Sequence, residues 1–190
     1  MNQRKPYFLG VNIPLIRILL EATRHLTGDV IEFGIGHGGT FSVIYEACKH
    51  SCFVYAVDCF TGVPESGIDG ENDRFAAGSH AYPGGFQQFH ADYPDASICK
   101  GLMENIVDKD VLPLSIRFAH IDFDLYEPTA HAIIYTWGHL VDGGIMIVHD
   151  YYHHDLTCAS RAVREFMEVN GVDYIGVVDN SIFFQKGAML

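Results

Sequence analysis

Basic residues are scarce in this sequence. Twelve lysines and arginines stand against 24 aspartates and glutamates, which gives a formal net charge of −12. Nucleic-acid phosphates and anionic membrane surfaces repel such a protein, so we expect neither as a partner. No apolar run approaches the roughly 20 residues that a membrane span needs. The basic N-terminus also lacks the long apolar stretch of a signal peptide, so we expect a cytoplasmic protein.

Paired cysteines are missing as well. The five cysteines are scattered, and none forms a CxxC pair: Cys48, Cys52, Cys59, Cys99 and Cys158. An odd, scattered set favours free thiols in a reducing compartment and speaks against a structural zinc site. Hydrophobic residues make up 48% of the 190 positions and charged residues 19%. This balance predicts one globular domain over residues 1–190 with a substantial core.

The sequence is rich in alternation between short apolar segments and amphipathic ones. We expect helices at 12–26, 40–50, 86–92, 127–140 and 157–170, and strands at 30–33, 52–57, 97–100, 116–121, 145–148, 174–178 and 182–185. This order predicts an α/β fold: a mainly parallel seven-stranded sheet with helices on both faces and a C-terminal antiparallel hairpin. We expect residues 1–27 to form an N-terminal helical segment. The glycine-rich stretch 62–85 is long for a loop, and we interpret it as a lid.

A glycine-rich turn follows the first predicted strand and precedes a helix. Gly34, Gly36 and Gly38 allow positive φ angles and a close approach of a ligand to the backbone, at the edge where open α/β sheets bind ligands. Asp58 ends the second strand, where an acid can accept hydrogen bonds from both hydroxyls of a ribose. The alternative is a tight turn with a surface aspartate.

The residue before this turn distinguishes between two classes of cofactor. Dinucleotide sites place a pyrophosphate against the glycine turn and the helix N-terminus. Here Glu32 stands two residues before Gly34. A carboxylate at that position suits an ammonium group better than a phosphate. S-adenosylmethionine has an ammonium and no phosphate, so Glu32 favours a methyl donor over a nucleotide.

Acidic residues also follow the fourth and fifth strands. Asp122 and Asp124 end the segment HIDFD, and His149 and Asp150 end the segment IVHD. Neighbouring parallel strands would bring Asp122 and Asp150 together, and paired carboxylates repel each other unless a proton or a cation compensates. Mg²⁺ is the natural partner, while the histidine keeps Mn²⁺, Fe²⁺ or Zn²⁺ open.

The segments VDCFTGVPES, HIDFDLYEPT and LVDGGIMIVHDYY, together with the run from Glu32 to Thr40, resemble the macrocin O-methyltransferase (TylF-like) family. The resemblance extends over about 28–168. It implies a Rossmann-like class I methyltransferase that uses S-adenosylmethionine and a divalent metal, usually Mg²⁺. Asp122 and Asp150 would then be metal ligands and Asp124 the general base. His149 stands where the family commonly has an aspartate, and it either ligates the metal or changes the site's affinity and selectivity.

The donor would bind Glu32, Gly34, Gly36, Asp58 and Asp122, with the adenine near Gly101 and Leu102, just after the third strand. The acceptor would be a hydroxyl of a sugar or of another small natural product. A nicotinamide-dependent oxidoreductase, a metal-dependent hydrolase and a non-catalytic binding domain are the alternatives. The sequence leaves open the acceptor, the metal and whether the chain forms a homo-oligomer.

Overall fold

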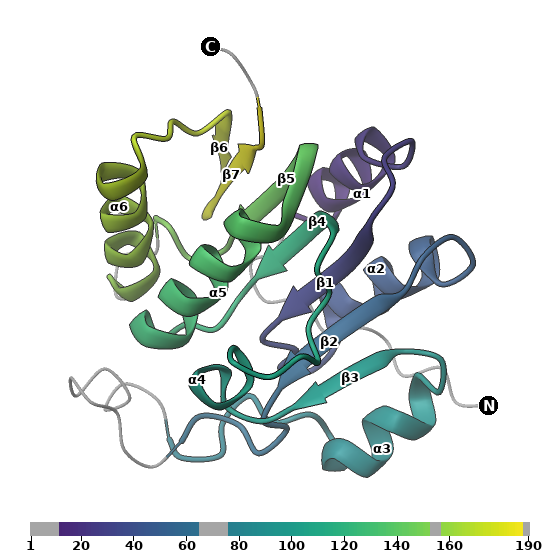
Figure 1. Cartoon of the computed structure of the whole chain (residues 1–190). Helices are drawn as coiled ribbons and strands as arrows, with labels where there is room; N and C mark the ends of the chain where they lie inside the picture. The colour runs from purple at the N-terminus through teal and green to yellow at the C-terminus, as the bar shows by residue number, and fades with distance from the viewer. Residues whose placement is uncertain (1–11, 65–75, 153–156, 188–190) are drawn as a thin grey trace.

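The computed structural model describes residues 12–64, 76–152 and 157–187, which form one seven-stranded sheet with helices on both faces (Figure 1). The strands are β1 (Asp29–Phe33), β2 (Val54–Asp58), β3 (Ser97–Lys100), β4 (Ile116–Ile121), β5 (Leu140–Val148), β6 (Gly176–Val178) and β7 (Ser181–Gln185). The helices are α1 (Ile13–Ala22), α2 (Gly39–Cys48), α3 (Gly85–Asp92), α4 (Met103–Ile106), α5 (Tyr126–His139) and α6 (Cys158–Asn170). None of the helices in these ranges is long and apolar enough to cross a bilayer.

The sheet has the strand order β3-β2-β1-β4-β5-β7-β6. Neighbours from β3 to β5 pair in parallel, whereas β7 runs antiparallel to both β5 and β6. All six residues of β4 are buried, as expected for a central parallel strand covered on both faces. The predicted fold is therefore confirmed, including the terminal hairpin.

Two hydrophobic cores lie on opposite faces of the sheet. On one face, α1, α2 and α3 cover residues such as Val30, Phe118 and Ile147. On the other face, α4, α5 and α6 cover the alternate strand residues, among them Phe33 and Ile121. Because successive strand residues point to opposite faces, the side chain of Glu32 belongs to the first face, together with Val30. This alternation decides which polar side chains meet at the end of the sheet.

The structure corrects several predicted boundaries. The predicted helix 12–26 ends at Ala22, where the hydroxyl of Thr23 donates to the carbonyls of Leu19 and Leu20. The guanidinium of Arg117 donates to the Thr23 carbonyl across 3.2 Å, so a distant side chain stabilises the helix end. Strand β5 begins at Leu140, directly after α5, and not at 145. Helix α4 was missed because its four residues are too short to show a periodicity.

Part of the predicted lid 62–85 lies outside the described residues. The two described ends of this segment meet, because the amide of Val63 donates to the carbonyl of Ser79 at 3.0 Å and the amide of Gly78 donates to Val63 at 2.9 Å. A side chain at Gly62 would overlap the carbonyls of Gly78 and Ser79. The segment thus leaves and rejoins the fold at one place, and its role as a lid stays a prediction.

Candidate active site

The carboxyl ends of the central strands form one edge of the sheet. Backbone hydrogen bonds continue past each strand there: the amide of Asp122 donates to Phe33 at 2.8 Å, and the amide of His149 donates to Ile121 at 2.9 Å. The residues that follow β1, β4 and β5 are therefore held at fixed positions relative to one another. This is the edge at which open parallel sheets bind their ligands.

The glycine-rich turn after β1 requires glycine for reasons of space and of backbone angle. Gly34 has φ +79°, and a Cβ there would lie 2.1 Å from the carbonyl oxygen of Asp122. Gly38 has φ +78°, and a Cβ there would lie 2.7 Å from the ring of Tyr82. Gly36, with φ +48°, is less crowded, because a Cβ there would make only an ordinary contact, at 3.6 Å, with the carbonyl oxygen of His80. Atoms of Asp122 and Tyr82 therefore pack closely against the turn at Gly34 and Gly38, whereas the turn is accessible at Gly36.

Asp58 lies against this turn, as the sequence predicted. One carboxylate oxygen accepts hydrogen bonds from the amides of Ile35, at 2.7 Å, and Gly36, at 3.3 Å. The other oxygen accepts from the amide of Phe60 at 2.5 Å. The oxygen that accepts from Phe60 has a second acceptor position, so Asp58 can fix the turn and still accept a hydroxyl. Binding of a ribose by Asp58 stays a prediction.

Glu32 is buried at the end of β1 and faces His120 on β4. The two residues are register partners, and Nδ1 of His120 lies 3.0 Å from Oε1 of Glu32. Burial raises the pKa of Glu32 to about 7, against the opposing effect of the hydrogen bond from His120. The second oxygen, Oε2, has no hydrogen-bond partner among the described residues. A buried carboxylate with one free oxygen is suited to a cationic ligand.

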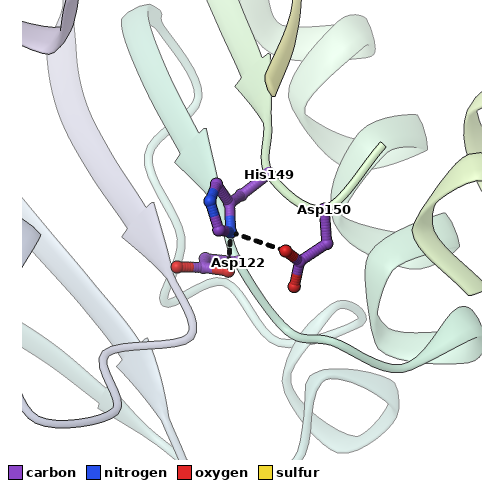
Figure 2. Close-up of side chains that lie close together, drawn as sticks. All are labelled: Asp122, His149 and Asp150. Carbon is purple, nitrogen blue, oxygen red and sulfur yellow. Dashed lines mark hydrogen bonds and ion pairs between the residues drawn. The ribbon is translucent and has the colours of Figure 1, made fainter. Parts of the chain in front are cut away.

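Asp122, His149 and Asp150 converge at the ends of β4 and β5 (Figure 2). Nδ1 of His149 lies 2.9 Å from a carboxylate oxygen of Asp122 and 3.2 Å from one of Asp150. One ligand atom from each residue lies within 4.8 Å of the other two. Burial alone would lower the pKa of His149, but the charges and hydrogen bonds of both aspartates outweigh it and raise the pKa to about 11. The predicted metal ligands are therefore close together.

Asp124 belongs to the same cluster. Burial, and then the negative charge of Asp122 and the hydrogen bond with Asp150, raise the pKa of Asp124 to about 9. Asp124 and Asp150 both have left-handed backbones, with φ of 63° and 59°. Residues other than glycine are uncommon in this region, and such conformations concentrate at functional sites. Here they aim two carboxyl groups at one point.

Gly101 and Leu102 follow β3 at the same edge, and the amide of Gly101 donates to the carbonyl of Asp58 at 3.0 Å. A cavity of about 240 Å³ opens beside them, lined in part by Phe60, Phe86 and Lys100. The ammonium of Lys100 lies 4.8 Å from the centre of the Phe86 ring. The cavity lies beside the predicted adenine position, but binding of adenine there stays a prediction.

Two residues of this region escaped the sequence analysis. His120 lies within the apolar strand β4, yet its Nε2 has no partner among the described residues, and its ring lies 6.4 Å from that of His149. Tyr82 supports the glycine turn and donates to Asp92 at 2.7 Å. The position of His120 could have been predicted from the alternation of side chains along β4, which puts His120 on the same face of the sheet as Glu32. No local pattern indicated Tyr82.

Similarity to one known protein family extends over most of the chain. Residues 18–186 match the sequence model of the family described as Macrocin-O-methyltransferase (TylF). No curated protein sequence matches the chain significantly.

Three solved structures illustrate the structural similarity. The O-methyltransferase NovP superposes with a TM-score of 0.78 at 19% identity, and the calicheamicin methyltransferase CalS11 with 0.73 at 18%; each comparison covers 93% of this chain and 79% of the other. Fibrillarin from Aeropyrum pernix, in complex with natively bound S-adenosyl-L-methionine, superposes with a TM-score of 0.54 at 16% identity, over 90% of this chain and 72% of fibrillarin. At these identities the similarity shows a shared Rossmann-like fold.

Proposed function

The chain belongs to the macrocin O-methyltransferase (TylF) family and is an S-adenosylmethionine-dependent O-methyltransferase; from this premise we propose that it methylates a hydroxyl of a sugar or of another small natural product with the help of a divalent metal. Family membership sets aside the oxidoreductase, hydrolase and binding-domain alternatives. Methyl transfer is an in-line displacement at a sulfonium, so the protein's main task is to align donor and acceptor.

The donor would bind across the ends of β1 and β2. Gly36 is the least crowded of the three glycines of the turn and would let the methionine part of the donor approach the backbone. The unpartnered Oε2 of Glu32 is the acceptor for the donor's ammonium group, directly or through a water molecule. Asp58, already fixed by the turn, would accept the ribose hydroxyls. Each residue binds a different part of the donor, which would fix the direction of its methyl group.

The donor set of Asp122, His149 and Asp150 fits a divalent metal. In the metal-free protein Nδ1 of His149 carries a proton between the two carboxylates, at 2.9 and 3.2 Å, and a divalent ion bound by the three residues would take the place of that proton. Two carboxylates suit Mg²⁺, and the imidazole nitrogen adds affinity for Mn²⁺ and other first-row ions. When bound, the cation would lower the pKa of a coordinated acceptor hydroxyl and offset the negative charge that keeps Asp124 protonated.

Asp124 would be the general base. Its carboxyl group lies beside Asp150, held by a left-handed backbone at the edge where acceptor and donor would meet. A carboxyl group accepts a proton only when ionised, and Asp124 in the metal-free cluster holds its own proton at neutral pH. We therefore expect the base to become competent only when the negative charge of the cluster is compensated.

The observation that supports metal assistance most directly is the convergence of Asp122, His149 and Asp150. Calorimetric titration with Mg²⁺ and Mn²⁺ tests it. We expect Mn²⁺ to bind with the higher affinity, and binding to be lost in Asp150→Asn. His149→Asp should reduce the preference for Mn²⁺ over Mg²⁺, because it replaces a nitrogen ligand by an oxygen ligand that suits both ions. The matched control Asp95→Asn removes an exposed acid outside the site and should bind like the wild type.

Absence of binding for both ions, or equal binding in Asp150→Asn and the wild type, would contradict the metal assignment. The acceptor class is tested separately. The chain is incubated with S-adenosylmethionine and a panel of glycosides, nucleotide sugars and catechols, and S-adenosylhomocysteine is quantified. We expect turnover with a hydroxyl-bearing sugar. Turnover confined to amine or thiol acceptors added to the same panel would refute the hydroxyl assignment.

A further inference from the structure

A second polar cluster lies at the opposite edge of the sheet from the proposed methyl-transfer site. Cys48 ends α2, and Cys52 lies two residues before β2 begins. Arg117 is the second residue of β4, near its amino end, and only 3% of its surface is exposed. The carboxyl ends of the parallel strands β1, β2 and β4 lie at the proposed active site. The cluster lies at the amino ends of these strands, at the opposite edge of the sheet.

The buried guanidinium of Arg117 contacts sulfur where a carboxylate would be expected. Its Nη2 lies 3.4 Å from Sγ of Cys52, 3.6 Å from Sγ of Cys48 and 3.4 Å from the hydroxyl of Ser51. Within residues 12–64, 76–152 and 157–187, no carboxylate forms an ion pair with Arg117, although its charge acts at longer range on Asp29. The nearest groups that can become anionic are therefore the two thiols.

A buried, permanently charged guanidinium without an anion is costly, which favours ionisation of one thiol. Cys52 is the better placed of the two, because it is less buried than Cys48 and its sulfur accepts a hydrogen bond from Arg117 at 3.4 Å and from the Ser51 hydroxyl at 4.0 Å. The thiol of Cys48, followed by Arg117, lowers the pKa of Cys52 to about 6. The neighbouring Cys52, followed by burial, raises the pKa of Cys48, so Cys48 keeps its proton.

We propose that Cys52 is a reactive thiolate, stabilised by Arg117, that hydroperoxides oxidise, and that Cys48 resolves the oxidised product as a disulfide. In the first step the sulfur of Cys52 attacks a peroxide oxygen. The O–O bond breaks, Cys52 becomes a sulfenic acid, and the alkoxide or hydroxide leaves and takes up a proton. In the second step the sulfur of Cys48 displaces the hydroxyl of that sulfenic acid, and water leaves with the thiol proton. Neither step depends on the proposed methyl transfer.

The backbone places the two cysteines one helical turn apart, since the amide of Cys52 donates to the carbonyl of Cys48 at 3.3 Å. The Cβ atoms of such a pair lie about 5–6 Å apart, and a disulfide needs roughly 4 Å. Bond formation therefore requires a shift of roughly 1–2 Å. Cys52 lies beyond the end of α2, where the chain can move without breaking the helix.

Alkylation of the full chain tests the thiolate. Iodoacetamide labelling is followed by mass spectrometry between pH 5 and pH 9, with Cys59 as internal reference because it is also half exposed but donates to a Gly62 carbonyl. At pH 6 we expect Cys52 to react about 10-fold faster than an ordinary thiol, after allowing for the lower nucleophilicity of a low-pKa thiolate. Arg117→Gln should abolish this advantage, and Arg117→Lys should retain it.

Equal rates for Cys52 and Cys59 at pH 6 in the wild type would overturn the proposal, whether or not the Arg117 variants fold. The resolving step is tested with substoichiometric hydrogen peroxide on Cys59→Ser. Trypsin separates the two cysteines after Lys49, so a disulfide would link peptides 25–49 and 50–74. We expect this cross-link, and its loss in Cys48→Ser. Sulfenic acid on Cys52 without the cross-link would refute the role of Cys48.

Discussion

Replacing Glu32 with glutamine should stabilise the ligand-free protein at alkaline pH. Burial raises the pKa of Glu32 from 4.5 to about 7, so the folded state holds a proton that the unfolded state has released between these values. The stabilisation from this proton is complete below pH 4.5 and is lost as the pH rises through 7. At about 1.4 kcal/mol per pKa unit, ionisation of Glu32 costs roughly 3 kcal/mol at pH 8. Glutamine keeps an oxygen for His120 and never ionises.

Urea unfolding at pH 5 and pH 8 measures this effect. Between the two values the free energy of unfolding of Glu32→Gln should rise by roughly 2.5 kcal/mol relative to that of the wild type. The matched control Glu46→Gln removes an exposed glutamate that pairs with Lys49 at 2.8 Å, and it should show less than about 1 kcal/mol of such change. A stability difference between Glu32→Gln and the wild type that is the same at both pH values would refute the burial argument.

Three further outcomes are expected. The affinity for S-adenosylmethionine should increase between pH 6 and pH 8 in the wild type, because the donor's ammonium needs ionised Glu32, and calorimetry on Glu32→Gln should show a flat profile. Asp124→Asn should keep donor affinity and lose roughly 10²- to 10⁴-fold in turnover, the usual effect of removing a general base; full activity would disprove that role. Gly34→Ala should lose donor binding and lower the melting temperature, since its Cβ would lie 2.1 Å from the Asp122 carbonyl; unchanged melting would show that the turn can move.

Much of the fold follows from local patterns. The strand before the glycine turn, the helix predicted at 157–170 and the C-terminal antiparallel hairpin were all predicted and are confirmed. These features depend on neighbouring residues alone. The proximity of Asp122 and Asp150 could also be predicted from the sequence, because adjacent parallel strands end at the same edge of the sheet.

Features that depend on register or on distant side chains could not be predicted in this way. The pairing of Glu32 with His120 requires the register between β1 and β4, which no single strand contains. The hydrogen bond at the end of α1 comes from Arg117, which lies 94 residues from Thr23 in the sequence. The proton shared within the cluster of Asp124 and Asp150 depends on burial and on backbone angles that the sequence does not show.

Titration of the protein with S-adenosylhomocysteine tests the proposed donor site most directly. Calorimetry should show micromolar binding that Asp58→Ala and Glu32→Ala each abolish, whereas Phe53→Ala, an exposed residue before β2 at the opposite edge, should bind like the wild type. Binding that survives both site substitutions, or no binding at all, would contradict the placement of the donor on the glycine turn.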